Sequence, residues 1–403
     1  MNSMNIHVLF SFAAGNPNRD DTGSPKAVSY GGSTRARISS QAMTRPKRLR
    51  FEAQTDGERT YRSASVGDEI AKQAQAILES SGMAVDENLR TTLRKAAAKS
   101  ALGLVMKQDS ANKKAETIGL GAAEKALQKS GGGSDDAEAG DTLVWLAESE
   151  INEAALKLAK KFDETIDPGT YVQAKQTKSL SIAAFGRMFA QRPDLQNEAA
   201  IQRSHAFTTH ESEVEVDYFT AVDDLRTLDR GAGHINLAML TGGVYYWYCN
   251  VDVRQLFSTW SGVADAGAAE RLVALFASLF EALPSGRQNT TGYQGLPAVV
   301  LAVPARSAVS LQSAFEAAIT ARDSGYLQPS VRALIEEHAA ARGAKPSHFG
   351  PGAVAIASRA ASEALGGIDL ADLGISSMSL DELAVWCADQ VLSERFAEPT
   401  GVS

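Results

Sequence analysis

The chain has 403 residues, of which 44% are hydrophobic and 22% are charged, the balance of an ordinary globular protein with room for two domains. Only two cysteines, Cys249 and Cys387, are present, which excludes a disulfide framework, and no apolar run reaches the length of a membrane span, so we predict a cytoplasmic protein. A net charge of −8 excludes a protein whose whole surface attracts nucleic acid.

The first predicted element is a strand from Met4 to Phe12. Apolar Ile6, Val8 and Phe10 alternate there with polar residues such as His7, which is the period of a strand. No basic residue precedes the segment, so we do not interpret it as a signal peptide.

The stretch from Lys26 to Arg50, here called the basic strip, concentrates positive charge. It holds seven Lys or Arg residues and no Asp or Glu. The rest of the chain therefore has 40 − 7 = 33 basic residues against 48 acidic ones, a net charge of −15. A basic strip on an acidic body is a local binding site, and the phosphates of a nucleic acid are the ligand that fits it best.

The basic strip begins as a predicted strand. Arg35 and Arg37 are two residues apart and share one face of it, while Ala36 and Ile38 point toward a core. The preceding Gly31-Gly32 allows the backbone to approach a ligand closely.

A predicted helix follows this strand. Ser39 and Ser40 are favoured at a helix N-terminus, where unpaired N–H groups, the helix dipole and two hydroxyls together suit a phosphate. Gln41, Arg45 and Arg48 share one helical face and extend the site. The alternative is a solvated basic helix with an ordinary serine cap. A nucleotide P-loop is not indicated, because the strip contains no Gly-Lys-Ser/Thr.

A helical block begins at about Thr60. Helical spacing predicts three helices, with a Gly- and Asp-rich loop between the last two: Ser65–Ser80, Val85–Lys107 and Asp141–Phe162. Asp167-Pro168-Gly169 ends the block with a turn, and β-like segments resume at Thr170–Phe189. The pattern predicts a helical insertion in a strand-containing domain.

The segment Glu211–Asp224 contains six acidic residues and no basic one, and its alternation predicts a strand. An acidic strand cannot lie along phosphates, but an aromatic side chain on it can still stack on bases or separate them. Tyr218 and Phe219 are the aromatic side chains available for this role. Packing inside the protein or between subunits is the alternative.

A strand pair, His234–Leu240 with Val244–Val253, is predicted around Gly242-Gly243. The run Tyr245–Tyr248 places aromatic side chains on both faces of the second strand. Because an RNP signature is absent, we favour packing over base stacking for this run.

Helices are predicted at Asp265–Leu283 and Ser307–Asp323, on either side of a strand at Ala298–Val303. Strand, insertion, paired strands, helix, strand and helix together indicate an α+β fold with a split sheet of the ferredoxin or RRM type. From Val331 onward the sequence predicts helices around a Gly/Pro loop and no functional motif.

One cluster is worth testing as an active site, formed by His205, His210, Glu211, Asp223 and Asp224. The spacing of the two histidines matches no metal motif, although a turn could bring both aspartates to Mg²⁺. A metal-dependent ribonuclease that uses His210, Asp223 and Asp224 is therefore the alternative function. Capping and turn roles are the simpler interpretation, and we predict no catalytic residue, no metal site and no cofactor.

Several sequence blocks together indicate a family. They are Ile6–Phe10, Asn18–Asp21, Gly31-Gly32, Arg37–Gln41, Phe185–Met188, His205–Glu211, Asp217–Asp224, Gly231–His234 and Leu327–Ser330. In this order they resemble the CasC family, whose members form the repeated backbone of the type I-E CRISPR Cascade surveillance complex. One departure is Thr44-Arg45-Pro46, where family members usually have Lys-Arg-Ala. Pro46 is expected to kink or end the helix, which would move Arg48 out of register with Arg45.

The resemblance implies an RRM- or ferredoxin-like palm (residues 1–58 and 167–403), a helical fingers insertion (59–166) and a β-hairpin-like thumb at about 206–232. It implies a non-catalytic subunit that binds crRNA, polymerises with other copies of itself, and meets target DNA and other Cascade subunits but no membrane. The basic strip and the resemblance together predict these RNA-binding residues: Lys26, Arg35, Arg37, Ser39, Ser40, Gln41, Arg45, Arg48, Met188 and Phe219. A third interpretation is a scaffold whose basic strip binds an acidic protein partner.

Overall fold

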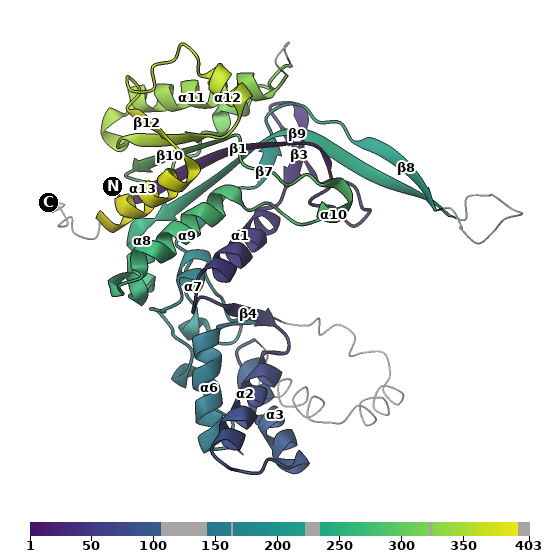
Figure 1. The fold of residues 1–403 in the computed structure, drawn as a ribbon, viewed down its shortest axis with the longest axis vertical. Coiled ribbons are helices and arrows are strands. Elements are labelled where there is room, and N and C mark those ends of the chain that lie inside the picture. The colour runs from purple at the N-terminus through teal and green to yellow at the C-terminus, as the bar shows by residue number, and fades with distance from the viewer. Residues whose placement is uncertain (106–142, 163, 222–233, 322–324, 394–403) are drawn as a thin grey trace, which may run out of the picture. The chain divides into compact units, whose positions relative to one another are not determined.

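The computed structural model describes residues 1–105, 143–162, 164–221, 234–321 and 325–393. By its internal contacts the chain divides into two compact units. The sheet unit consists of Met1–Phe51, Ile201–Arg254 and Ala266–Ser403, and the helical unit of Glu52–Ala200 and Gln255–Asp265. Figure 1 shows the elements of both units.

Ten of the described strands form one sheet in the sheet unit. Along its main path they are β12 (Ile375–Met378), β11 (Gly352–Ile356), β10 (Val299–Ala305), β1 (Ser3–Gly15), β9 (His234–Asp252), β7 (Ala206–Thr208), β3 (Ser33–Ile38) and β2 (Ala27–Tyr30). Two more, β6 (Ile201–Arg203) and β8 (Glu215–Ala221), also pair with β9. Only β11 and β12 pair in parallel among the described strands, so the sheet is mixed, and the predicted α+β fold is confirmed.

Strand β1 is the centre of this sheet. Its Ile6 lies opposite Cys249 of β9 and Ala302 of β10, and every residue from Ser3 to Phe10 is buried. A strand that is buried on both faces must be covered by helices on both sides. The predicted strand at Met4–Phe12 is therefore confirmed, and the polar His7 within it is buried as well.

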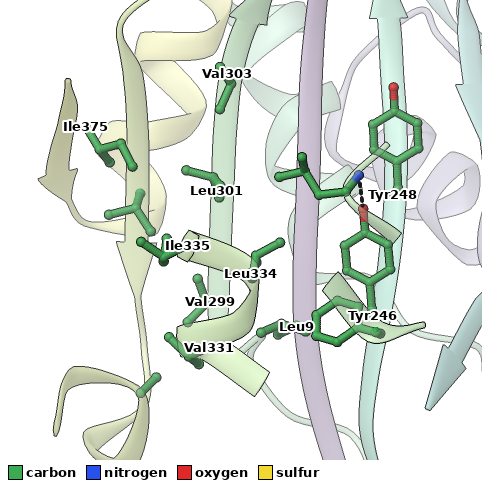
Figure 2. Close-up of a cluster of buried hydrophobic side chains, with 14 of the residues drawn as sticks. Leu9, Tyr246, Tyr248, Val299, Leu301, Val303, Val331, Leu334, Ile335 and Ile375 are labelled. Carbon is green, nitrogen blue, oxygen red and sulfur yellow. Dashed lines mark hydrogen bonds between the residues drawn. The ribbon is translucent and has the colours of Figure 1, made fainter. Parts of the chain in front are cut away.

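Helices cover both faces of the sheet (Figure 1). Those that belong wholly or in part to the sheet unit are α1 (Ser40–Gln54), α8 (Val253–Thr259), α9 (Ala268–Glu281), α10 (Gln288–Thr291), α11 (Leu327–Ala344), α12 (Arg359–Ala364) and α13 (Leu380–Ser393). Helices α11 and α12 lie on one face, and α9 and α13 on the other. Figure 2 shows the core under α11, where Leu334 and Ile335 lie near Leu301 of β10 and Leu9 of β1.

The aromatic run on β9 is packed between these two layers of helices. Tyr245, Tyr246, Trp247 and Tyr248 are all buried, with at most 7% of any one of them exposed. Tyr246 and Tyr248 belong to the core of Figure 2, whereas Trp247 faces the other layer and lies under Lys47 of α1. Packing is therefore the correct interpretation of this run.

The predicted strand pair around Gly242-Gly243 is wrong, because β9 continues through both glycines as one strand. A Cβ at Gly242 would lie 1.9 Å from the carbonyl oxygen of Ala13, and one at Gly243, whose φ is +125°, would lie 2.0 Å from Nε2 of His210. The glycines therefore allow close approach within the sheet rather than a hairpin turn. The partner of the first half of β9 is β8, and the two form a ribbon that extends from the sheet (Figure 1).

The predicted helix at Ser307–Asp323 is also wrong, since the described part of this range, residues 307–321, forms no helix longer than the 3-10 turn at Gln312–Phe315. The backbone N–H groups of this segment have partners outside it. Val309 donates to Oδ1 of Asn5, Leu311 to the hydroxyl of Tyr246, and Ile319 to the carbonyl oxygen of Thr209. These tertiary hydrogen bonds replace the helical ones that the local pattern favoured.

The predicted helix Asp265–Leu283 is confirmed as α9, and the strand Ala298–Val303 as β10. Beyond Val331, where only helices were expected, the chain also forms the strands β11 and β12. In the described part of the chain no helix is both long and apolar enough to cross a membrane.

The helical unit contains helices around a core composed mainly of Leu and Ala side chains. Its elements are β4 (Thr60–Ser63), α2 (Val66–Ser80), α3 (Glu87–Leu102), β5 (Val144–Ala147), α6 (Glu148–Lys160) and α7 (Leu180–Phe185), with 3-10 turns at Pro168–Thr170, Pro193–Leu195 and Ser261–Ala264. The first two predicted helices are confirmed as α2 and α3. The third begins as strand β5, which pairs with β4, before it continues as α6.

The predicted β-like segment at Thr170–Phe189 is wrong, because it contains the helix α7. Its N-terminus is capped twice: Ser179 accepts the backbone N–H of Ile182, and the buried carboxylate of Glu58 accepts those of Leu180 and Ser181. A buried acid at a helix N-terminus stabilises the helix over an extended chain.

Candidate nucleic-acid interface

The basic strip folds as a strand followed by a helix, as predicted. β3 carries Ala36 and Ile38 into the core, and α1 begins two residues later at Ser40. The hairpin that leads into β3 turns at Gly31-Gly32, whose φ angles are both positive. A Cβ at Gly31 would lie 1.6 Å from the carbonyl oxygen of Glu316, so the close approach at this glycine is to the protein's own backbone.

Arg35 is buried, which corrects the expectation that it lies on an exposed face with Arg37. Its Nη1 donates to the carbonyl oxygen of Thr208 at 3.1 Å, and its Nη2 to those of Phe315 and Glu316 at 3.2 and 3.3 Å. Three backbone acceptors bind the two Nη atoms of this guanidinium inside the protein, while its buried Nε has no hydrogen-bond partner among the described residues. Arg35 is therefore a structural residue that holds the Phe315 segment against β3.

Arg37 is partly exposed and lies beside two other polar residues. Its Nη1 is 3.2 Å from Nδ1 of His205, and its backbone N–H donates to the carbonyl oxygen of Lys26. Lys26, Arg37 and His205 thus form a group at the end of β3, here called the strand-end cluster. The sequence places His205 among the possible active-site residues and in a family block but not with the basic strip; pairing of β7 with β3 brings it here from 168 residues away.

The N-terminus of α1 is already capped, which corrects the expectation of unpaired N–H groups there. Ser39 donates its N–H to Oδ1 of Asn18 at 2.8 Å, Ser40 donates to Nδ1 of His205 at 3.0 Å, and Ala42 donates to the hydroxyl oxygen of Ser39 at 3.2 Å. Ser39 is thus the N-cap, as its residue type predicted. A phosphate at this point would therefore contact side chains, because the backbone N–H groups of Ser39, Ser40 and Ala42 already have acceptors.

Helix α1 presents one face to solvent and buries the other. Gln41 and Arg45 are exposed and Arg48 is partly exposed, while Met43 and Phe51 are buried. Pro46 is expected to kink or end the helix, and it does not end it, because α1 continues to Gln54. Met43 and Phe51, on either side of the proline, are buried, and the side chains of Gln41, Arg45 and Arg48 are all accessible to solvent.

Lys47 is a buried member of the basic strip that charge counting could not distinguish from the exposed ones. Its Nζ donates to the carbonyl oxygens of Leu279 and Ala282 at 2.7 and 2.8 Å, at the end of α9, and lies 4.3 Å from the ring centroid of Trp247. Burial lowers the pKa of Lys47 to about 7. Arg50 is paired with Glu281 of α9. Both residues attach α1 to α9.

The ribbon of β8 and β9 has one apolar face and one face that carries acidic side chains together with Phe219. Tyr218 lies opposite Leu237 and Val216 opposite Met239, so these four share one face, whereas Phe219 shares the other with Glu215 and Asp217. Tyr218 is 70% and Phe219 48% exposed. Phe219 also borders an open hollow of about 470 Å³ whose other lining residues are Ser285, Arg287, Gln288, Asn289 and Thr290.

Met188 lies in the helical unit and is 79% exposed. Its neighbours Arg187 and Phe189 are both buried, and backbone hydrogen bonds in both directions join Arg187 to Asn197. Arg187 forms a two-pronged ion pair with Glu150, with Nη–Oε distances of 2.5 and 3.0 Å and no exposed surface on either side chain. A rigid support therefore holds this methionine outward.

Comparison with known proteins decides the family. A family model described as "CT1975-like protein" matches residues 4–386. The chain belongs to the CT1975-like family. This is the CasC family of Cascade backbone subunits, so the resemblance in the sequence blocks is confirmed.

Two solved structures share the fold of this CT1975-like chain. A chain of a "CRISPR RNA-guided surveillance complex, pre-nicking" has 27% sequence identity and a TM-score of 0.74, over 98% of this chain and 100% of that one. A chain of a "CRISPR RNA-guided surveillance complex" has 23% identity and a TM-score of 0.58 over the same shares, which shows the fold alone. No curated protein sequence matches the chain.

The histidine of the alternative active site has a structural role in this family member. His210 is buried; its Nδ1 lies 2.6 Å from the carbonyl oxygen of Glu211, its Nε2 accepts the N–H of Val244, and its ring stacks on Tyr326. Both ring nitrogens are therefore engaged by the protein. Asp223 and Asp224 lie outside the described residues, and within the described residues no group of three His, Cys, Asp or Glu side chains could hold a metal ion.

Proposed function

We propose that this chain is the non-catalytic, crRNA-binding backbone subunit of a type I-E Cascade surveillance complex. Copies of it would polymerise along the guide RNA, contact the other Cascade subunits, and present the bases for pairing with target DNA. Sequence specificity then lies in the guide, as in other RNA-guided systems. Family membership and the likeness to a chain of a surveillance complex support this assignment.

The observation that carries the RNA contact is the exposed part of the basic strip. Lys26 and Arg37 lie at the end of β3, and Arg45 and Arg48 on the outer face of α1, all with solvent-accessible side chains. Four cations on an otherwise acidic chain form a path suited to successive phosphates. Ser40 and Gln41 add hydrogen-bonding groups along the same path, whereas Arg35 and the N–H of Ser39 are already occupied.

We assign the parts of the chain to the family's architecture as part of this proposal. The RRM-like palm consists of residues 1–58 and 167–403, the fingers of 59–166, and the thumb of about 206–232, which includes β8. Phe219 and Met188 would contact bases, because both are apolar and exposed; Phe219 lies on β8, and Met188 lies between the buried residues Arg187 and Phe189. Aromatic or apolar side chains can make these contacts even where neighbouring acidic residues repel phosphates.

The test is to purify the chain from cells that co-express a CRISPR array and the other Cascade subunits, and to extract the bound RNA. The proposal predicts discrete RNA of guide length in a complex with several copies of the chain. Complexes that form without RNA and survive nuclease treatment would indicate the scaffold function instead. Metal-dependent RNA cleavage that Asp223→Ala abolishes would indicate the ribonuclease.

A further inference from the structure

The backbone on either side of His205 is fixed in place. Ser204 donates its N–H to the carbonyl oxygen of Tyr248, and its hydroxyl accepts the N–H of Tyr248. On the other side, Ala206 pairs with Ile38 of β3. The imidazole is nevertheless exposed, so a rigid segment of backbone holds an accessible side chain at the strand-end cluster.

The hydrogen bonds of His205 determine which ring nitrogen carries the proton. Nδ1 accepts the backbone N–H of Ser40 at 3.0 Å and lies 3.2 Å from Nη1 of Arg37, which can only donate. A nitrogen that accepts from these groups has no proton of its own, so the neutral ring carries its proton on Nε2. Partial burial, then Arg37 and Lys26, lower the pKa of His205, which keeps the ring neutral at physiological pH.

The second ring nitrogen is therefore a donor that points away from Ser40. Among the described residues none makes a hydrogen bond to this Nε2–H. Arg37 lies beside the other ring nitrogen, 3.2 Å from Nδ1, and Lys26 is near enough to lower the pKa of the ring, and neither cation offers this donor an acceptor. An N–H donor on an exposed ring with two cations nearby suits an anionic oxygen.

We propose that His205 is a further RNA-contacting residue, whose Nε2–H donates to a phosphate oxygen held at the strand-end cluster by Arg37 and Lys26. This inference rests on the proposed function. It assigns two roles to one ring: Nδ1 caps α1, and Nε2 binds the ligand. A neutral donor adds affinity but releases no counterion, so its contribution is distinguishable from that of an arginine by its salt dependence.

Two substitutions separate the two roles. In His205→Asn the amide oxygen can take the place of Nδ1 and accept the N–H of Ser40, but no donor reaches the position of Nε2. In His205→Gln the longer amide can reach the position of Nε2 with a donor, while the cap is lost. Arg37→Ala is the matched control for a charged contact in the same cluster.

The experiment measures binding of the full-length chain to a fluorescein-labelled single-stranded RNA over a salt series, with unfolding in urea as the readout of folding. We expect His205→Asn to unfold like the wild type, to bind about tenfold more weakly, and to keep the wild-type salt slope. We expect His205→Gln to be less stable yet to bind more tightly than His205→Asn, once binding is corrected for the folded fraction.

If His205→Asn binds RNA with wild-type affinity while Arg37→Ala binds it more weakly, the role of His205 is overturned and the proposed function stays intact. An unchanged affinity in both variants, or no RNA binding by the wild type, would contradict the proposed function itself.

Discussion

The Nη2 atom of Arg35 donates to the carbonyl oxygen of Phe315 at 3.2 Å, across 280 residues of sequence. Arg37, two residues further along β3, is partly exposed and directed to the strand-end cluster. The basic strip is therefore two sets of residues. Arg35, Lys47 and Arg50 hold the sheet unit together, whereas Lys26, Arg37, Arg45 and Arg48 have side chains that solvent reaches.

Arg35→Ala should lower the free energy of unfolding by about 3 to 5 kcal/mol, because it removes a buried cation and leaves three carbonyl oxygens without their donor. Arg37→Ala, at a partly exposed site, should change it by less than about 0.5 kcal/mol. Urea unfolding of both variants measures the difference. Equal stability of the two variants would show that the buried hydrogen bonds of Arg35 contribute little.

Pro46→Ala should stabilise the chain by about 1 to 3 kcal/mol, because α1 runs through the proline and alanine restores a helical N–H. The exposed face of Gln41, Arg45 and Arg48 should not move, so RNA affinity should stay at the wild-type value. Thermal unfolding and RNA binding check both statements. A loss of affinity on this substitution would mean that the proline sets the direction of the basic face.

Glu150→Gln should destabilise the helical unit by about 3 to 5 kcal/mol, since the cation of Arg187 would stay buried without its carboxylate. Met188→Ala is the control on the adjacent residue. It removes an exposed side chain and should change stability by less than about 0.5 kcal/mol while weakening RNA binding. If Met188→Ala binds RNA like the wild type, the predicted base contact at this residue is wrong.

The stability of the chain should fall as the pH drops below 6.5, and His7 should be one cause. Burial lowers the pKa of His7 to about 3, from an ordinary value of 6.5, so between these values the unfolded chain binds a proton that the native chain does not. The slope from this residue is about 1.4 kcal/mol per pH unit.

The variant His7→Asn can keep an acceptor for the hydroxyl of Tyr246, which lies 2.9 Å from Nδ1 of His7, but does not titrate. Urea unfolding at several pH values between 6 and 4 should give a shallower slope for the variant than for the wild type. Parallel slopes would show that His7 is protonated in the native state as readily as in the unfolded chain.

Local patterns in the sequence predicted the elements whose signals are local. The alternation in β1, the serine cap and single polar face of α1, and the periodicity of α2 and α9 all led to the right element. The segment Ser307–Asp323 has a helical pattern too, but tertiary hydrogen bonds to Asn5 and Tyr246 decide its conformation. Such partners are not visible in a window of neighbouring residues.

The same limit applies to the site. The type of a basic residue predicts that it lies at the surface. Arg35 and Lys47 are buried instead, because each donates to carbonyl oxygens more than 170 residues away, which the local sequence does not indicate. His205 reached the basic strip only through the pairing of β7 with β3. Charge and spacing predicted the strand and the helix of the basic strip correctly, whereas the fold decided which of its residues face solvent.

The salt dependence of RNA binding is the measurement to make, on the wild type and on Arg37→Ala/Arg45→Ala. If these arginines contact phosphates, the logarithm of the affinity should fall linearly with the logarithm of salt concentration. The double variant should then show a slope smaller by about 1.4, at about 0.7 per phosphate contact on a single strand. An unchanged slope and affinity in the double variant would contradict the assignment of RNA phosphates to this face of the chain.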